Sequence, residues 1–304
     1  MQLSKIIKNL KPHYRSHFFS NLSSNSKECK KDDIFFSIKG KRHNGNKFIK
    51  DAISRGARTI VSNIKPEGLK NGVLYIYNNN PRRFLAECTK SFYKKKPKNI
   101  IAVTGTNGKT SIADFYYQIL KLCKKPVCSI GTLGVKTQNF KRETINTTLD
   151  NIALNKLLEK LYKKKINNVI LEASSHGLYQ YRLHGIDFQA GIFTNLTRDH
   201  LDYHKTFKNY LNAKIILFKN LLKKNGVIVF SRNTKPERIL KKISKKRKIK
   251  KIILGKNSDF EITKHITFSN LQKIQFKYKN KEYIFNTKLL GEIQVINLMM
   301  ALMV

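Results

Sequence analysis

One short segment constrains the fold more than any other part of the chain, and it runs from Ile100 to Ser111 with the sequence IIAVTGTNGKTS. Its apolar, β-branched residues 100–103 predict a buried strand, residues 111–121 predict a helix, and a glycine-containing loop joins the two. Such a loop aims several backbone N–H groups at one point, and the helix N-terminus behind it adds about half a positive charge. The segment therefore predicts a phosphate site in an α/β fold, and ATP is the simplest ligand.

The spacing of the loop differs from that of a standard Walker A motif, because Gly105 stands three residues before Gly108 and position 103 is Val. Lys109 can still reach terminal phosphates, and the hydroxyl of Thr110 can bind Mg²⁺. The alternative is a glycine turn followed by a solvated lysine. The residues expected to bind the nucleotide through this loop are Gly105, Thr106, Asn107, Gly108, Lys109, Thr110 and Ser111.

Length and composition favour a globular chain in a reducing compartment. The 304 residues are enough for two domains, and 40% of them are hydrophobic. No apolar run has the length of a membrane span, and the first residues lack the apolar centre of a signal peptide. The cysteines form neither a CxxC pair nor a metal-finger spacing, which favours the cytoplasm and excludes a disulfide framework. They are Cys29, Cys88, Cys123 and Cys128.

A formal charge of +42 raises the alternative of a nucleic-acid-binding protein. Twelve of the 61 basic residues are Arg, so lysine supplies the other 49, and arginine is the better residue for bidentate phosphate and base recognition. The lysines are spread along the chain beside many Asn and Ile, as compositional drift of a whole proteome would produce. The densest run, residues 241–251, is interpreted as a solvated face. We expect no membrane partner and no nucleic acid, although a basic surface would gather ATP or a UDP-sugar.

The layout predicts two α/β domains, at residues 1–97 and 98–304. In the first, strands are expected at 33–38, 59–61 and 74–77, with helices at 48–56 and 81–93. The charged, proline-containing residues 94–98 mark the boundary. In the second, strands at 100–103, 168–171, 190–193 and 227–230 alternate with helices at 152–164 and 207–222. This alternation predicts a mostly parallel sheet that binds its ligand at the carboxyl ends of the strands. Short strands at 252–254, 274–278 and 283–285 follow.

Two further strands end in residues that can do chemistry. Glu172 follows the strand at 168–171, where nucleotide-hydrolysing enzymes hold Mg²⁺; the alternative is a carboxylate that caps the next helix. Residues 194–204 follow the next strand and include His200 and His204 beside two aspartates, although a lone histidine is usually structural. Lys214 precedes an apolar run, so its amine is expected to be partly desolvated. The alternative for Lys214 is an exposed lysine on a helix surface.

These pieces together resemble the Mur ligases, the ATP-dependent amide-forming enzymes of peptidoglycan synthesis. The resemblance rests on TGTNGKT at 104–110, EASSHG at 172–177 and TNLTRDHLDYH at 194–204, followed by Tyr210 and Lys214. Within the family it favours the MurE type, which adds the third residue of the stem peptide, through GTLG at 131–134, NTT at 146–148, and Gln180 with Arg182. DIF at 33–35 and the glycines near 40, 45 and 56 fit the first domain of that type.

The resemblance implies a role for each matching residue. The first domain would bind the UDP end of UDP-MurNAc-L-Ala-D-Glu, and the central domain would bind ATP and two Mg²⁺ ions. The implied catalytic residues are Lys109, Glu172, His200 and Lys214, and the implied metal ligands are Thr110, Glu172, His200 and Lys214 once CO₂ has carbamylated it. Asn297 would lie near the adenine. The implied substrate-binding residues are Ser26, Asn146, Thr147, Thr148, Ser174, Gln180 and Arg182.

The implied reaction has two steps. The D-Glu carboxylate takes the γ-phosphate of ATP to give an acyl phosphate, and the amine of a diamino acid then displaces phosphate. Diaminopimelate is favoured over lysine because it is common in the family, and the sequence does not decide between them. A folylpolyglutamate synthetase (FPGS) shares this logic but usually has Gly where Thr110 stands.

The chain stops in a segment that resembles the start of the last helix of the family's central domain, at residues 298–304. The resemblance implies that a C-terminal Rossmann-like domain, which would select the amino acid, comes next in the family, and we expect it to be missing from this chain. The chain could be a fragment, a split-gene product whose partner chain carries that domain, or a decaying copy. Local departures are Asn25 and Lys27 around Ser26, Ile293 with Gln294 before Asn297, and Thr234 after Asn233. We expect the chain alone to bind nucleotide weakly and not to complete ligation.

Overall fold

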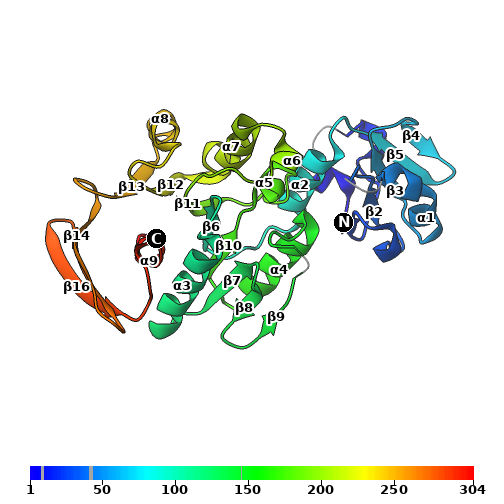
Figure 1. Ribbon diagram of the computed structural model, residues 1–304. Helices are drawn as coiled ribbons and strands as arrows, with labels where there is room; N and C mark the ends of the chain where they lie inside the picture. The colour runs from blue at the N-terminus through cyan, green and yellow to red at the C-terminus, as the bar shows by residue number, and fades with distance from the viewer. Residues whose placement is uncertain (8–9, 41–43, 145) are drawn as a thin grey trace. The chain divides into compact units, whose positions relative to one another are not determined.

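The computed structural model describes residues 1–7, 10–40, 44–144 and 146–304 (Figure 1). The chain forms two compact units. The first contains Met1–Lys96, Asp150–Glu159 and Gln180–Gly185, and the second contains Pro97–Leu149, Lys160–Tyr179 and Ile186–Val304. Two later segments of the chain thus fold with the first unit. Within the described residues, no helix is both long enough and apolar enough to span a membrane.

The first unit is built on a five-stranded sheet with the order β1-β2-β3-β5-β4. The strands β1 (Leu22–Ser23), β2 (Ile34–Phe36), β3 (Thr59–Ser62) and β5 (Val73–Tyr77) run parallel, and β4 (Gly68–Lys70) runs antiparallel at the edge. The helices are α1 (Ile49–Ser54) and α2 (Pro81–Phe92). The side chain of Asn80 caps α2 by accepting a hydrogen bond from the N–H of Arg83, and Pro81 occupies the first turn, where a missing N–H costs nothing.

The second unit contains the mostly parallel sheet that the sequence predicted. Six of its strands run parallel in the order β13-β12-β11-β6-β10-β7. They are β6 (Asn99–Thr104), β7 (Val127–Gly131), β10 (Asn168–Glu172), β11 (Phe188–Phe193), β12 (Leu222–Ser231) and β13 (Lys250–Leu254). Strand β6 lies between β11 and β10, so the carboxyl ends of these three strands meet at one edge of the sheet.

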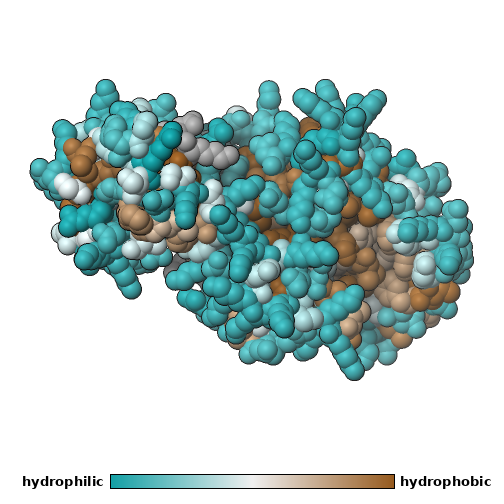
Figure 2. All heavy atoms as spheres, turned by 180° about the vertical axis from the view of Figure 1, so that it is seen from behind, coloured by the Kyte–Doolittle hydropathy of each residue, from teal (hydrophilic) through white to brown (hydrophobic). Residues whose placement is uncertain are grey.

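Five further strands extend this sheet at both sides, and all of their pairings are antiparallel except the parallel pairing of the first of them, at 260–267, with β13. β8 (Gly134–Thr137) and β9 (Lys141–Arg142) follow β7, while β14 (Phe260–Thr267), β15 (Gln272–Tyr278) and β16 (Lys281–Thr287) follow β13. We did not predict β7, β8 or β14 from the sequence. On the second extension, the ring of Phe260 stacks on that of Tyr278 at 4.2 Å between centroids. Figure 2 shows hydrophobic surface on this part of the second unit, where Ile284 and Leu290 are exposed.

The helices that follow β6 are α3 (Lys109–Leu122), α4 (Asn151–Lys163), α5 (Ser175–Tyr179), α6 (Leu201–His204), α7 (Phe207–Ile216), α8 (Glu237–Arg247) and α9 (Glu292–Leu302). The sequence predicted α3, α4 and α7 and, by resemblance, part of α9, but it gave no range for α5, α6 or α8. The helix expected over 207–222 is α-helical only as far as Ile216, because Leu217–Leu221 form a π-helical turn that leads directly into β12. Arg247 closes this turn by donating hydrogen bonds to the carbonyl oxygens of Phe218 and Leu222 at 2.6 and 2.7 Å.

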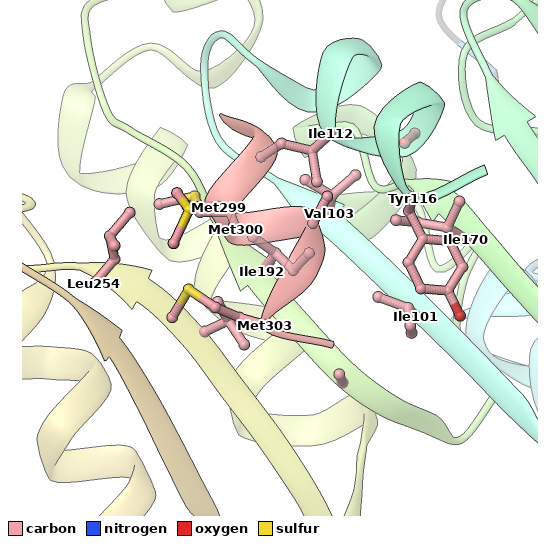
Figure 3. Packing of buried hydrophobic residues seen from close by; sticks show 14 of the residues in the cluster. Ile101, Val103, Ile112, Tyr116, Ile170, Ile192, Leu254, Met299, Met300 and Met303 are labelled. Atoms are coloured by element: carbon pink, nitrogen blue, oxygen red, sulfur yellow. The ribbon is translucent and has the colours of Figure 1, made fainter. Parts of the chain in front are cut away.

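The last helix is part of the central core. Met299 and Met300 of α9, and Met303 directly after it, are buried in the same cluster as Val103 of β6 and Ile112 of α3 (Figure 3). Flexible, unbranched methionines fit the irregular space between a helix and a sheet. This packing brings Asn297 to the loop between β6 and α3, since a Cβ atom on Gly108 would lie 2.6 Å from its Oδ1 atom.

Candidate nucleotide site

The loop between β6 and α3 has the backbone that its glycines allow. Gly105 has a φ of +146° and Gly108 a φ of +84°, values that L residues with a side chain rarely adopt. Gly105 is also in close contact with the next strand, because a Cβ atom there would lie 1.8 Å from Oγ1 of Thr194. The loop leads directly into α3, so its amides and the helix N-terminus face the same edge of the sheet.

Lys109 folds back over this loop. Its Nζ atom donates hydrogen bonds to the carbonyl oxygens of Gly105 at 3.1 Å and Thr106 at 2.6 Å. Burial lowers the pKa of Lys109, and the carboxylates of Glu172 and Asp199 oppose that effect. The lysine is therefore bonded to backbone oxygens of the loop, where it is placed to turn toward an arriving phosphate.

Glu172 lies at the carboxyl end of β10, next to the loop. Its Oε2 atom accepts hydrogen bonds from the hydroxyls of Thr110 at 2.9 Å and Thr132 at 3.2 Å, and its Oε1 atom accepts one from the N–H of Thr132 at 2.8 Å. The side chain is 2% exposed. These contacts place the carboxylate against the phosphate loop. The alternative prediction was that Glu172 caps the helix that follows it in the chain. Thr132 is a contact that the sequence analysis did not include in the site.

Directly after β11 lie two residues of the 194–204 segment to which the sequence analysis assigned no role in the site. Thr194 donates a hydrogen bond to the carbonyl oxygen of Asn107 at 2.6 Å, and the side-chain oxygen of Asn195 accepts one from the N–H of Asn107 at 2.9 Å. The feature of the sequence that could have predicted this is the presence of two polar residues directly after a strand that neighbours β6. Both residues hold the tip of the phosphate loop in place.

Lys214 is buried, so the alternative of a lysine on a helix surface is wrong. It is 1% exposed, its Nζ atom donates a hydrogen bond to the carbonyl oxygen of Gly105 at 2.6 Å, and it lies 4.4 Å from the centre of the Tyr210 ring. Burial and then the nearby charge of Lys109 lower the pKa of Lys214 to about 7. Two lysines from different helices thus donate to one carbonyl oxygen.

The lowered pKa of Lys214 gives a testable pH dependence. Burial disfavours the ammonium in the folded state, so the penalty is fully present below pH 7 and disappears as the pH rises from 7 toward 10.5, the ordinary value. Replacing the group by Lys214→Met removes the penalty. We expect the stability of the variant relative to the wild type to be greatest below pH 7 and to decline above it, as measured by urea unfolding in CO₂-free buffer.

Lys208→Met, at an exposed position of the same helix, should show no such trend. Parallel curves for wild type and Lys214→Met would contradict the assignment.

His200 lies beside this group rather than against Glu172. It precedes α6 with a φ of +51°, and its Nε2 atom lies 3.4 Å from Oδ2 of Asp199. Its ring centroid lies 4.9 Å from that of His176 and 6.2 Å from that of Tyr210. Tyr210 in turn contacts Thr106 of the loop, with 3.1 Å between the two hydroxyl oxygens. The imidazole is therefore connected to the phosphate loop through Tyr210.

The oxygen atoms beside the loop fit Mg²⁺. Within the described residues, no group of three His, Cys, Asp or Glu side chains could hold a metal ion by itself. Mg²⁺ is usually bound by one or two carboxylates together with substrate phosphates and water, however, and it prefers oxygen ligands. The paired hydroxyl of Thr110 and carboxylate of Glu172 are such ligands.

The residues expected to bind the substrate are found in both units. In the second unit, the hydroxyls of Thr148 and Ser174 lie 2.9 Å apart, Thr147 lies 3.3 Å from Thr132 between hydroxyl oxygens, and Asn146 is exposed. In the first unit, Arg182 donates hydrogen bonds to the side-chain oxygen of Gln180 at 2.8 and 3.1 Å. Ser26, also in the first unit, is 5% exposed in a short 3₁₀ turn.

A pocket of about 260 Å³ opens next to the loop in the second unit. Its wall includes Asn297, which the sequence analysis expected near the adenine, and other residues to which it assigned no binding role. The lining residues are Thr194, Asn195, Ser231, Arg232, Asn233, Thr234, Ile293, Ile296, Asn297 and Met300. A mixed polar and apolar wall of this kind suits a planar heterocycle attached to a phosphate chain.

Comparison with known proteins decides the family. A model of the Mur ligase middle domain matches residues 103–304, and a model of the Mur ligase family catalytic domain matches residues 19–93. The chain belongs to the Mur ligase family. This Mur ligase chain is 40% identical to a UDP-N-acetylmuramoyl-L-alanyl-D-glutamate–2,6-diaminopimelate ligase of Rickettsia montanensis, over 97% of the chain and 62% of that relative. It thus spans less than two thirds of the relative's length.

Solved structures agree with the family assignment. A UDP-N-acetylmuramoyl-L-alanyl-D-glutamate–2,6-diaminopimelate ligase superposes with a TM-score of 0.87 at 26% identity, over all of this Mur ligase chain and 63% of the other. An FPGS–AMPPCP complex superposes with a TM-score of 0.57 at 13% identity, over 74% of this chain and 62% of the other. The second likeness shows a shared fold only, so the FPGS alternative finds less support than the Mur ligase interpretation.

Proposed function

We propose that this chain is the precursor-binding and ATP-binding part of a MurE-type ligase of peptidoglycan synthesis, working in the cytoplasm. Its proposed substrates are UDP-MurNAc-L-Ala-D-Glu, ATP and a diamino acid, with diaminopimelate favoured. The observation that supports this best is the convergence at one loop: Lys109 and Lys214 both donate to the carbonyl oxygen of Gly105, and Thr110 donates to Glu172. An exposed glycine turn would need no such set of buried polar contacts.

The proposed roles follow the geometry of each unit. Residues 1–97 would bind the UDP end of the precursor, with Ser26 near the uridine, and residues 98–304 would bind ATP. The loop 105–111 would hold the phosphates, and the pocket beside Asn297 would hold the adenine. Thr148 and Ser174, whose hydroxyls lie 2.9 Å apart, would hold the dipeptide, together with Asn146, Thr147, Gln180 and Arg182.

Magnesium would be held by Thr110, Glu172, His200 and a carbamylated Lys214, with two ions expected. When bound, Mg²⁺ neutralises the phosphate charge that would otherwise repel an incoming carboxylate. Lys109 would point its ammonium at the terminal phosphates, and Lys214 would present a carbamate in place of an amine. Thr194 and Asn195 would keep the loop in the shape that its hydrogen bonds already define.

The proposed reaction has two steps. An oxygen of the D-Glu side-chain carboxylate attacks the γ-phosphorus of ATP, and the bond between this phosphorus and the oxygen it shares with the β-phosphate breaks. ADP departs, and the D-Glu carboxylate has become an acyl phosphate. The amine of the diamino acid then attacks the acyl carbon, loses a proton and expels inorganic phosphate, which leaves an amide. Fixed positive groups around the loop would stabilise the charge that develops during phosphoryl transfer.

Carbamylation of Lys214 can be tested without turnover. An amine must be unprotonated to attack CO₂, and a pKa of about 7 leaves much of Lys214 in that form at neutral pH. With ¹³C-bicarbonate, we expect a carbamate carbon resonance in the NMR spectrum of the wild type that is absent from Lys214→Ala. Lys208→Ala serves as the control and should keep it. The same spectrum for wild type and Lys214→Ala would exclude a carbamate at this position.

The proposed function is tested by purifying the 304-residue chain and measuring two quantities. We expect ATP to bind in the presence of Mg²⁺ and UDP-MurNAc-L-Ala-D-Glu to bind independently, as calorimetry would show. We expect no tripeptide product when diaminopimelate is added, since the matched relative is much longer. Tripeptide formation would contradict the expected inactivity, and the absence of binding by both ATP and the UDP-precursor would contradict the proposed function itself.

A further inference from the structure

The fold gathers lysines that look scattered in the sequence. The six parallel strands of the second unit have their amino ends at one edge of the sheet, opposite the edge that carries the phosphate loop. In this unit, α3, the last residues of α4 (160–163) and α8 end close before β7, β10 and β13, at the amino edge. Charged residues at these helix ends and strand starts therefore lie along a single edge, about 24 Å long from the strand spacing.

Exposed lysines recur along this edge. Lys124 and Lys125 lead into β7, Lys164 and Lys165 into β10, and Lys248 into β13, and all five are exposed. The last turns of α3 and α8 add further lysines. In the described part of this unit, the segments that lead into the six strands carry a single acid, Asp187 before β11. The amino edge is thus strongly positive, and we call it the lysine edge.

Compensation of helix dipoles explains only some of these charges. A cation at a helix C-terminus is favourable, and one or two for each helix would be ordinary. Lys98, Lys223 and Lys224, however, lie directly before β6 or at the start of β12, away from the ends of the α-helices. The nucleotide does not explain them either, because the phosphate loop is at the opposite edge.

The chemistry of the lysine edge favours a diffuse anionic surface over sequence recognition. Arg247, the arginine in the last turn of α8, donates to carbonyl oxygens of its own unit and is not available for bidentate contacts with an outside phosphate. Two apolar side chains stand out among the lysines, Leu122 at the end of α3 with 83% exposure and Tyr162 near the end of α4 with 42% exposure. Lysines around a protruding leucine and tyrosine are the combination that binds the headgroup region of an anionic bilayer.

We propose that the lysine edge docks the protein on an anionic membrane surface. The protein lies on the bilayer without crossing it, Leu122 and Tyr162 enter the headgroup layer, and the phosphate loop faces away toward the aqueous phase. This proposal revises the expectation from sequence that the chain has no membrane partner, because the sequence alone does not place the lysines on one edge. It is independent of the proposed ligase function, since ATP binding and lipid binding occur at opposite edges of the sheet.

Co-sedimentation with vesicles tests the proposal on the purified 304-residue chain. We expect binding to mixed phosphatidylglycerol–phosphatidylcholine vesicles, weakening with added salt, and no binding to phosphatidylcholine alone. The variant Lys125→Glu/Lys164→Glu/Lys224→Glu/Lys246→Glu should bind at least about tenfold more weakly. A matched control with the same change of charge on the β14–β16 sheet should keep nearly full binding: Lys264→Glu/Lys273→Glu/Lys279→Glu/Lys281→Glu, all at exposed positions.

Further variants and outcomes separate membrane docking from an effect of net charge, from nucleic-acid binding and from loss of folding. Leu122→Gln, which changes no charge, should weaken vesicle binding and leave ATP binding unchanged. If the fourfold glutamate variant does not fold, the same four positions changed to Gln should still weaken binding relative to a Gln version of the control. Equal losses in the edge and control variants would overturn the proposal in favour of net charge alone. Binding of random-sequence DNA without binding of vesicles would overturn it in favour of nucleic acid, and absence of both would overturn it outright.

Discussion

Replacing Lys109 by alanine is expected to lower the affinity for ATP in the presence of Mg²⁺ about tenfold to a hundredfold. The side chain lies half-buried over the loop and is already bonded to the carbonyl oxygens of Gly105 and Thr106, so it can pass to a phosphate without large rearrangement. A charge-assisted hydrogen bond lost from a partly desolvated site accounts for an effect of this size. Isothermal titration calorimetry of wild type and Lys109→Ala measures the change.

The matched control is Lys121→Ala, at an exposed position in the last turn of the same helix. It should leave ATP affinity unchanged, because Lys121 lies at the far end of α3 from the loop. A second check is thermal unfolding of Lys109→Ala, which should show a folded protein. Equal affinities for wild type and Lys109→Ala would mean that the loop does not hold the phosphates.

Gly105→Ala is expected to destabilise the second unit by about 3 kcal/mol or more. A Cβ atom at this position would lie 1.8 Å from Oγ1 of Thr194, which donates to the carbonyl oxygen of Asn107, and the φ of +146° is itself unfavourable for alanine. Overpacking and backbone strain each cost about 1–3 kcal/mol, and here they act together. Urea unfolding followed by circular dichroism gives the difference in free energy.

Gly291→Ala separates the two causes. Its φ is +85°, so the backbone cost is present, but a Cβ atom there would meet nothing within 4 Å. We expect only this backbone cost of about 1–3 kcal/mol, and therefore a smaller loss than for Gly105→Ala. A second comparison is Gly105→Ala combined with Thr194→Ala, which removes the clashing hydroxyl and should recover part of the stability. If the two glycine variants lose the same stability, the close approach of the loop to β11 is contradicted.

The parallel core of the second unit could be predicted because its strands are short, apolar and fully buried. Residues 100–103 and 190–193 are such strands, and the structure confirms them as parts of β6 and β11. The hairpin β7–β8 and the strand β14 escaped prediction for a physical reason. β14 has a mixed, half-exposed pattern along Phe260–Thr267, and its pairing with β13 and β15, rather than its own periodicity, defines it.

Part of the candidate site could also be read from the sequence. The phosphate loop and Glu172 follow predicted strands directly, so parallel topology alone was enough to bring them together. The burial of Lys214 was only suggested by the apolar run after it, because tertiary packing against Tyr210 and the loop decides it. Thr132 and Thr194 lie in segments that carry the family resemblance, but their side-chain contacts with Glu172 and Asn107 form only after the sheet has formed. Arg232 belongs to no such segment, and it reaches the pocket beside the loop in the same way.

The central claim is that the loop 105–111, Glu172 and Lys214 form one site for a metal-bound nucleotide. Its most direct test is a crystal structure of the chain with a non-hydrolysable ATP analogue and Mn²⁺, located by anomalous scattering. The account predicts the triphosphate along the loop, with a manganese peak between Thr110 and Glu172 at bonding distance from an oxygen of each. Nucleotide bound elsewhere, or manganese far from both residues, would contradict it.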